Sequence, residues 1–154
     1  MVNITSTETR NQIITMVREF VKRDVEPIAN QYDDEDIYPA ELVDKMAEMG
    51  LFGITLPEEY GGMGLDYTTF AMIFEELSKG WMSVSGVLGT HHILAYMLYT
   101  YGTEEQKQRM LPRMATGEIR AGLALTEESG GSDIQAIQTR ATKDGEEYVI
   151  NGRK

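Results

Sequence analysis

The segment "TEESGGSD", which begins at Thr126, groups several residues that could bind a small molecule. Thr126 and Ser132 supply hydroxyl groups, while Gly130 and Gly131 let a ligand approach the backbone closely. Successive free amides can form a concavity that holds an anion, so the segment could bind a polar or anionic cofactor group. A polar loop in which Ser132 and Asp133 cap the next turn explains the same residues, and the residues alone favour that interpretation. The phosphate-binding patterns GxxxxGK[ST] and GxGxxG after a first strand are both absent from the sequence.

Two adjacent histidines, His91 and His92, are the other candidates for chemistry. Imidazole serves as a base near neutral pH and as a metal ligand. Neighbouring residues of a helix point to different faces, so the pair makes a poor metal site. We predict one histidine at the helix surface, the other in the packing, and no metal site. The acidic pairs of the chain are expected to be solvated faces or caps.

Composition limits the classes of protein that the chain can belong to. Its 154 residues, 42% hydrophobic and 25% charged, are enough for one globular domain with a core. The formal net charge of −11, with scattered basic residues, argues against a nucleic-acid partner. The sequence contains no cysteine, which excludes disulfides and thiolate chemistry and fits a reducing compartment. We therefore expect a cytoplasmic protein.

One stretch, residues 80–103, contains no Asp, Glu, Lys or Arg over a length that could cross a bilayer. It also contains internal glycines, two histidines and several hydroxyl side chains, so it is not continuously apolar. The segments on either side have the periodicity of amphipathic helices. We therefore predict a central helix that is buried on most sides, and no membrane span.

The residues up to 118, which would position the candidate side chains, are predicted to form helices. Apolar residues recur at helical spacing over residues 5–31, where Thr5 and Glu8 have the spacing of a capping box. Pro27 is expected to bend or end the last turn of this helix.

Later helix boundaries are marked by capping residues. Pro39 suits a first helical position and Gly50 suits a stop. Asp66 can cap another helix, whose apolar stripe includes two phenylalanines. Thr103 and Gln106 again have capping-box spacing and predict a helix after the uncharged stretch.

The pattern changes near residue 119. The segments "EIRAGLALTEE", "IQTRATKDG" and "EEYVINGRK" are typical of strands, and Asp144-Gly145 predicts a hairpin turn between the last two. The predicted fold class is mainly α, with an all-α domain over residues 1–118 and a short β remnant over residues 119–154. A second turn signal, Asn151-Gly152, is followed by only two residues, so we expect the chain to be a fragment of a larger protein.

Four segments resemble the N-terminal part of the acyl-CoA dehydrogenase family. They are "LPEEYGGMGLDY", "YGTEEQKQRMLPRMATGE", "LALTEESGGSD" and "DGEEYVINGRK", and they occur in the order and at the spacing of that family. The resemblance covers nearly the whole chain. It implies an N-terminal helical bundle followed by the start of a middle β-domain, and a parent enzyme that uses FAD to oxidise the Cα–Cβ bond of acyl-CoA thioesters.

The resemblance also implies roles for particular residues. Leu123, Leu125 and Thr126 would lie against the flavin ring, with backbone amides and the threonine hydroxyl bonding to its polar edge. Gly131 and Ser132 would lie near the FAD pyrophosphate, and Ser132 could also touch the CoA arm of the substrate.

Positions on the uncharged central helix correspond to the acyl pocket of the family. Ser85, Gly86 and Gly89 occupy them, and such small residues would leave room for a long or bulky acyl chain. Close helix packing is an equally good explanation of small residues. The sequence departs from the usual "TEPGAGSD" of the family at Glu128 and Ser129, and Glu128 adds a negative charge near a phosphate-bearing ligand.

The catalytic carboxylate of the family would lie beyond residue 154, so we expect no catalytic residue in this chain and no activity of the chain alone. The resemblance implies an acyl-CoA substrate, an electron-transfer flavoprotein as electron acceptor, and a homo-oligomer. The alternative function is a stand-alone helical module for protein association, without flavin chemistry.

Overall fold

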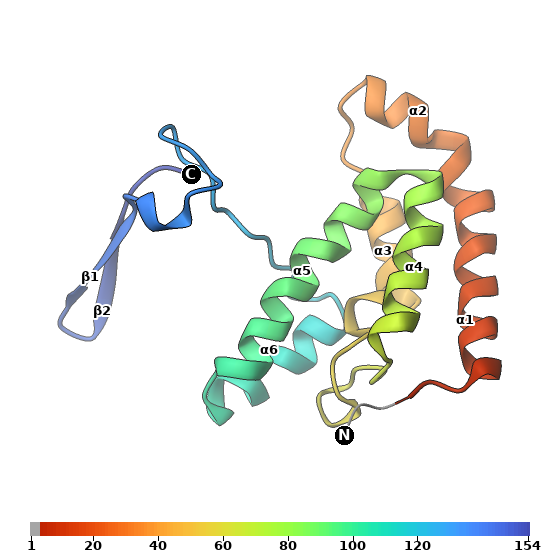
Figure 1. The fold of residues 1–154 in the computed structure, drawn as a ribbon, viewed down its shortest axis with the longest axis horizontal. Helices are drawn as coiled ribbons and strands as arrows, with labels where there is room; N and C mark the ends of the chain where they lie inside the picture. The colour runs from red at the N-terminus through yellow and green to blue at the C-terminus, as the bar shows by residue number, and fades with distance from the viewer. Residues whose placement is uncertain (1–3) are drawn as a thin grey trace. The chain divides into compact units, whose positions relative to one another are not determined.

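The computed structural model describes residues 4–154, which form two compact units (Figure 1). The first unit ends at Gly122 and is helical, and the second runs from Leu123 to Lys154 and contains a two-stranded sheet. The mainly α fold class is confirmed. The helices are α1 (Thr7–Phe20), α2 (Glu26–Asp34), α3 (Ala40–Glu48), α4 (Tyr67–Gly80), α5 (Met82–Tyr101) and α6 (Glu104–Ala115).

The first predicted helix continues beyond its expected end. A π-helical turn, Val21–Val25, joins α1 to α2, and helical structure persists to Asp34. Pro27 lies just after this wide turn. A proline in a helix lacks an N–H and crowds the carbonyl four residues earlier, and a locally widened helix relieves that contact. Pro27 therefore does not end the helix.

The predicted cap at Thr5 is wrong. Ser6 caps α1, because its Oγ accepts a hydrogen bond from the Thr9 amide at 3.1 Å. Thr5 instead donates its amide to Asp66 Oδ2 at 2.7 Å, and its Oγ1 accepts from the Asp66 amide at 3.2 Å. Asp66 caps α4 as predicted, accepting from Thr69 N at 2.8 Å. The starts of α1 and α4 are thereby bonded together.

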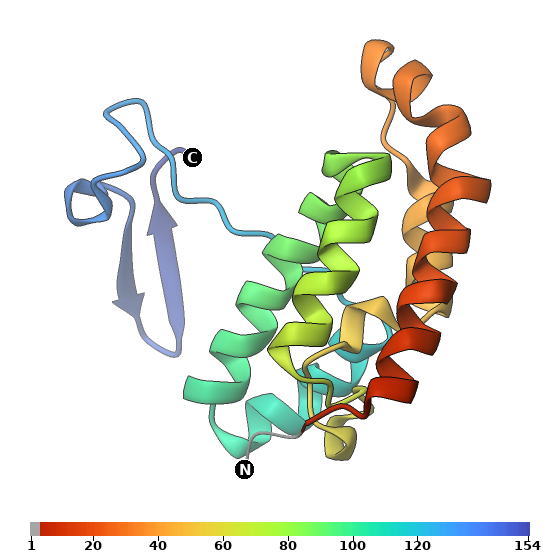
Figure 2. The ribbon, with the colours of Figure 1, turned by 45° about the vertical axis from the view of Figure 1, so that its right-hand side comes forward.

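The core of the helical unit lies where α1, α4 and α5 pack side by side, with α4 in the middle (Figures 1 and 2). The turn Leu51–Gly53 inserts between α3 and α5, and its side chains are fully buried. Burial of this apolar surface is the main stabilising contribution. The largest buried apolar side chains include Phe20, Phe52, Met46, Leu51, Ile54, Leu56, Ile73, Leu77, Leu88 and Leu111.

The long uncharged helix α5 is less buried than predicted. One face is buried through Val84, Leu88 and Ala95, whereas Tyr96 and Tyr101 are 50% and 79% exposed. Over residues 4–154, no helix combines the length and apolar character that a bilayer span requires.

The second unit contains a hairpin in which β1 (Arg140–Asp144) pairs antiparallel with β2 (Glu147–Asn151). The turn residues are Gly145 and Glu146, one position later than predicted, with Gly145 in the left-handed region at φ 59°. The predicted strand in "EIRAGLALTEE" does not form. A strand needs a neighbour to pair with, and only Glu127 at its end makes a bridge, to Gly130.

Candidate cofactor and acyl-group sites

The "TEESGGSD" segment folds into a tight turn. The Glu127 amide donates to the Gly130 carbonyl at 2.9 Å, and the Gly130 amide donates back to the Glu127 carbonyl at 3.1 Å. Glu128 and Ser129 occupy the tip, so the two positions that depart from the family pattern are compatible with the turn. Glu128 is exposed and pairs with Arg153 at 2.8 Å, which partly offsets its charge.

Two of the predicted cofactor residues lie against each other. A Cβ atom added to Gly131 would lie 2.8 Å from Thr126 Oγ1, so only glycine allows this close approach. Leu123 and Leu125 are each 38% exposed, and Thr126 and Ser132 are exposed as well. The segment therefore presents two apolar side chains and two hydroxyls at its surface.

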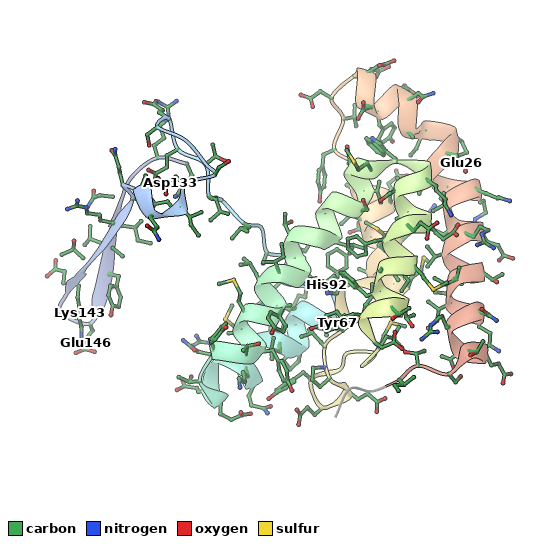
Figure 3. The ribbon with its side chains drawn as sticks, in the orientation of Figure 1. Glu26, Tyr67, His92, Asp133, Lys143 and Glu146 are labelled. Atoms are coloured by element: carbon green, nitrogen blue, oxygen red, sulfur yellow. The ribbon has the colours of Figure 1, made fainter. Side chains whose placement is uncertain are left out.

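The capping interpretation of this segment holds for Asp133, labelled in Figure 3. Its Oδ1 accepts a hydrogen bond from the Gln135 amide at 3.2 Å, at the start of the short 3₁₀ turn Ile134–Ala136. Asp133 is thus committed to local structure, whereas the side chains of Thr126 and Ser132 are exposed.

Glu127 organises the segment and was not foreseen from the sequence. Its carboxylate accepts hydrogen bonds from Thr139 Oγ1 at 2.6 Å, from the Thr139 amide at 3.0 Å and from the Gln138 amide at 2.8 Å. Lys154 Nζ lies 3.0 Å away. The Thr139 hydroxyl, followed by the two amides, lowers the pKa of Glu127 to about 2. Its partners lie more than ten residues along the chain, so no local spacing indicates this role.

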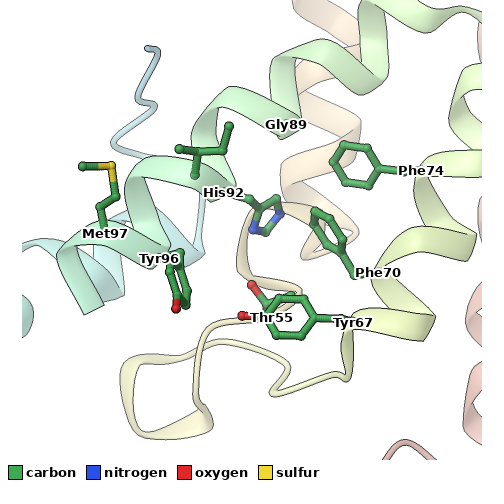
Figure 4. Close-up of a pocket in the computed structure, with 9 residues that line it drawn as sticks. Thr55, Tyr67, Phe70, Phe74, Gly89, His92, Tyr96 and Met97 are labelled. Atoms are coloured by element: carbon green, nitrogen blue, oxygen red, sulfur yellow. The ribbon is translucent and has the colours of Figure 1, made fainter. Parts of the chain in front are cut away.

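The helical unit contains an apolar pocket of about 460 Å³ between α4 and α5 (Figure 4). Phe70 and Phe74, predicted to be buried, are only half-buried because they form one wall of this pocket. We call this space the α4–α5 pocket. It is lined by Thr55, Tyr67, Phe70, Phe74, Gly89, His92, Ile93, Tyr96 and Met97.

The prediction of one surface histidine is wrong, because His91 and His92 are both buried. Their Nε2 atoms lie 3.2 Å from the Phe52 carbonyl and 2.9 Å from the Leu51 carbonyl. A carbonyl only accepts, so Nε2 of His92 carries a proton. Burial lowers the pKa of His92 to about 4, so the ring is neutral near pH 7. Both rings contact carbonyls of the buried 3₁₀ turn Leu51–Gly53. Helical periodicity does not reveal this turn, so the sequence alone suggested that one of the two histidines would be exposed.

His92 also reaches the α4–α5 pocket, as does Tyr67 from the first turn of α4 (Figures 3 and 4). The buried Nδ1 of His92 accepts no hydrogen bond from any described residue. The pocket wall therefore contains a neutral imidazole beside the Phe70 ring, which in turn lies against Phe74.

Of the three predicted acyl-pocket positions, only Gly89 lines the α4–α5 pocket. Gly86 is exposed, with open space where a Cβ would be. Ser85 is buried, accepts a hydrogen bond from Ser78 Oγ at 2.9 Å and donates to the Met82 carbonyl at 2.7 Å. In the part of the chain that the structure describes, no three His, Cys, Asp or Glu side chains are grouped to hold a metal ion.

Comparison with known proteins identifies relatives of the whole chain. The chain is 40% identical over 153 residues to the 3-(aryl)acrylate reductase of Clostridium sporogenes, covering 96% of this chain and 40% of the relative. It is 43% identical over 140 residues to the short-chain specific acyl-CoA dehydrogenase of Clostridium acetobutylicum, covering 90% and 37%. The chain thus spans about 40% of the length of these curated relatives.

Solved structures show the same similarity. A chain in a structure described as the electron transferring flavoprotein of Acidaminococcus fermentans superposes with a TM-score of 0.89 at 40% identity. The match covers 96% of this chain and 39% of that one. The family model for the acyl-CoA dehydrogenase N-terminal domain matches residues 7–118, which include helices α1 to α6. The chain therefore belongs to the acyl-CoA dehydrogenase family.

Proposed function

We propose that this chain is the N-terminal part of an FAD-dependent acyl-CoA dehydrogenase that oxidises the Cα–Cβ bond of acyl-CoA thioesters. The match of residues 7–118 to the N-terminal domain of the family is the observation that carries the proposal. Relatives named as reductases of acrylate derivatives, from Clostridium sporogenes and Anaerotignum propionicum, support a Cα–Cβ bond as the reacting bond. The chain is proposed to act in the cytoplasm. Its lack of cysteine fits this reducing compartment, where proteins rarely contain disulfides.

The proposed flavin surface is the segment from Leu123 to Ser132. The exposed side chains of Leu123 and Leu125 would contact the flat ring, and the Thr126 hydroxyl would bond to its polar edge. The glycine at position 131 fits this role, because a larger residue would displace Thr126. Bound FAD would supply the hydride acceptor, while this chain would orient the ring with donors near the charge that develops there.

The remaining contacts concern the phosphates and the substrate. Gly131 and Ser132 would lie near the FAD pyrophosphate, with Ser132 also touching the CoA arm. On α5, Gly89 would form part of the acyl-group wall in the α4–α5 pocket, and Ser85 and Gly86 would allow close approach farther along the helix. We assign no catalytic acid or base to this chain, and we propose that it is inactive alone.

We propose a homo-oligomer as the working form and an electron-transfer flavoprotein as the electron acceptor. The structural relative described as an electron transferring flavoprotein supports the acceptor.

A second candidate function is protein association without flavin chemistry. The exposed apolar side chains of α5 favour it, since Ile93 is 47%, Met97 46% and Tyr101 79% exposed. Apolar patches of this kind commonly mark association surfaces.

Absorbance spectra of the purified chain, before and after addition of FAD and gel filtration, distinguish the two functions. The flavoprotein proposal predicts that flavin bands co-elute with the protein. Protein that elutes as an oligomer without any flavin absorbance, at FAD concentrations well above those of the protein, would instead support the association module.

A further inference from the structure

The α4–α5 pocket contains an unusual share of ring side chains. Five of its nine lining residues carry an aromatic or imidazole ring, and none carries a formal charge when His92 is neutral. Its volume of about 460 Å³ lies within the range of small-molecule sites. Because no charged group lines it and most of its surface is apolar, the pocket suits an uncharged, apolar group rather than a carboxylate or phosphate.

The rings are arranged as a wall of faces and edges. The Phe70 and Phe74 centroids are 4.3 Å apart with planes 35° apart. His92 meets Phe70 edge to face at 5.1 Å, with the planes 84° apart. Aromatic rings have negative faces and positive edges, so such a wall can contact another ring through complementary charges.

The opposite side of the pocket leaves space for a ligand. Gly89 contributes no side chain, and a Cβ there would already contact Phe74 Cε1 at 3.5 Å, so the glycine keeps the surface of the Phe74 ring free of an α5 side chain at this point. Tyr96, half exposed at the pocket rim, supplies a further ring surface (Figure 4). A flat group in the pocket could therefore lie against the Phe70 and Phe74 rings, with the Tyr96 ring at the rim.

We propose that the α4–α5 pocket binds the distal end of an acyl group and prefers an aromatic ring there to an aliphatic one of equal size. This inference rests on the proposed function, because it assigns the pocket to the acyl group of the substrate. A purely apolar cavity would bind phenyl and cyclohexyl groups according to their buried area alone. Ring–ring contacts add a factor of roughly 2 to 10 in affinity for the aromatic group.

The test compares two thioesters of N-acetylcysteamine, made from 3-phenylpropanoic acid and from 3-cyclohexylpropanoic acid. Each is titrated into the 154-residue chain labelled at its methionine and isoleucine methyl groups. Ile93 and Met97 report binding in the pocket, and Met16 and Ile137, which do not line it, report binding elsewhere.

Two matched variants on α5 assign the preference to the pocket. Tyr96→Leu removes a lining ring, whereas Tyr101→Leu makes the same change at a residue outside the pocket. Both tyrosines are substantially exposed, so the fold should tolerate either change, and the methyl spectrum checks it.

The phenyl probe should bind roughly 2- to 10-fold tighter and shift Ile93 and Met97. Tyr96→Leu should reduce this preference and Tyr101→Leu should leave it unchanged. Equal affinities for the two probes, shifts only at Met16 or Ile137, or an unaltered preference in Tyr96→Leu would each overturn the inference. Both probes lack CoA and the assay lacks FAD. The outcome of this test therefore does not depend on whether the chain binds flavin, and FAD binding can be tested independently of the pocket.

Discussion

The imidazole of His92 lies in apolar surroundings, where a positive charge is unfavourable. Its ordinary pKa of 6.5 is lowered to about 4 by burial, so the unfolded chain takes up the proton first as the pH falls. The stability that neutral His92 contributes is therefore complete above about pH 6.5 and is lost between pH 6.5 and 4. The carboxylates with lowered pKa, such as Glu76, lose their contribution only at lower pH.

His92→Gln should reduce the acid sensitivity of folding, because glutamine has no ionisable group and can still donate to the Leu51 carbonyl. Urea unfolding at pH 7 and pH 5 measures this. Between those values the native chain should lose about 2 kcal/mol more of its free energy of unfolding than the variant does. His91 is unchanged in both chains and cancels in the comparison. An equal loss in the two chains would contradict a buried, neutral His92.

Glu127→Gln should loosen the "TEESGGSD" segment. The carboxylate accepts from the amides of Gln138 and Thr139, and loss of its charge weakens both bonds. The protection of these two amides, measured relative to their intrinsic exchange rates, should fall, as it should in the native chain when the pH falls from about 4.5 toward 2 and Glu127 takes up a proton.

Glu128→Gln is the matched control for this measurement. It makes the same change at the next residue, where the partner is the exposed Arg153. Exchange at Gln138 and Thr139 that is equally slow in all three chains would show that Glu127 does not hold the segment.

At the scale of elements, the end of α4 packs very closely on the π-helical turn after α1. A Cβ added to Gly80 would lie 2.5 Å from Val21 Cγ1, closer than real side chains approach. Arg18 holds the same pair of helices with two hydrogen bonds to Glu76, at 2.8 and 3.1 Å. The chain needs a residue without a side chain at this crossing.

Gly80→Ala should lower the free energy of unfolding by about 1–3 kcal/mol, because the methyl group must displace Val21. Gly86→Ala makes the same change in a helix at a position with open space, and should raise stability by about 0.5–1 kcal/mol through helix propensity. Chemical unfolding of the two variants measures both values. A stabilised Gly80→Ala variant would mean that α4 and the π-helical turn pack more loosely than described.

Local signals explain which elements could be predicted from the sequence. Asp66 and Thr103 cap their helices as expected, and Thr103 and Gln106 form both bonds of a capping box, because a cap depends on residues three apart. Thr5 failed as a cap because Asp66, sixty-one residues away, competes for its hydrogen bonds. The strand expected near residue 119 failed because a strand needs a partner that no local pattern supplies.

Among the candidate site residues, too, those within one short segment could be predicted and those that depend on tertiary packing could not. Thr126 and Gly131 could be singled out because they lie in one short segment, and the structure brings them into contact. The sequence could not predict the burial of His92 or the pocket wall formed by Phe70 and Phe74. Both depend on how α4, α5 and the turn at Leu51 pack together. Helical periodicity identifies an apolar face but does not distinguish a packed core from an open pocket.

At the scale of the whole molecule, the helical unit and the segment after it are proposed to have separate roles in binding. The helical unit, matched over residues 7–118 by the family model, contains the α4–α5 pocket that is proposed to hold the acyl group. The unit from Leu123 onward carries the proposed flavin contacts. Because each unit has its own internal contacts, changes at Thr126 should leave the stability of the helical unit unaltered.

Calorimetric titration of the 154-residue chain with FAD tests whether the segment from Leu123 to Ser132 binds the flavin cofactor. Three chains are compared: the native chain, Thr126→Ala with Ser132→Ala, and a control with Thr142→Ala, which removes a hydroxyl from an exposed position of the same unit outside the proposed flavin surface. The native and control chains should bind FAD saturably, and the Thr126→Ala, Ser132→Ala variant should bind it more weakly by roughly tenfold or more. Absence of saturable binding, or equal affinity in all three chains, would contradict a flavin surface at Leu123 to Ser132.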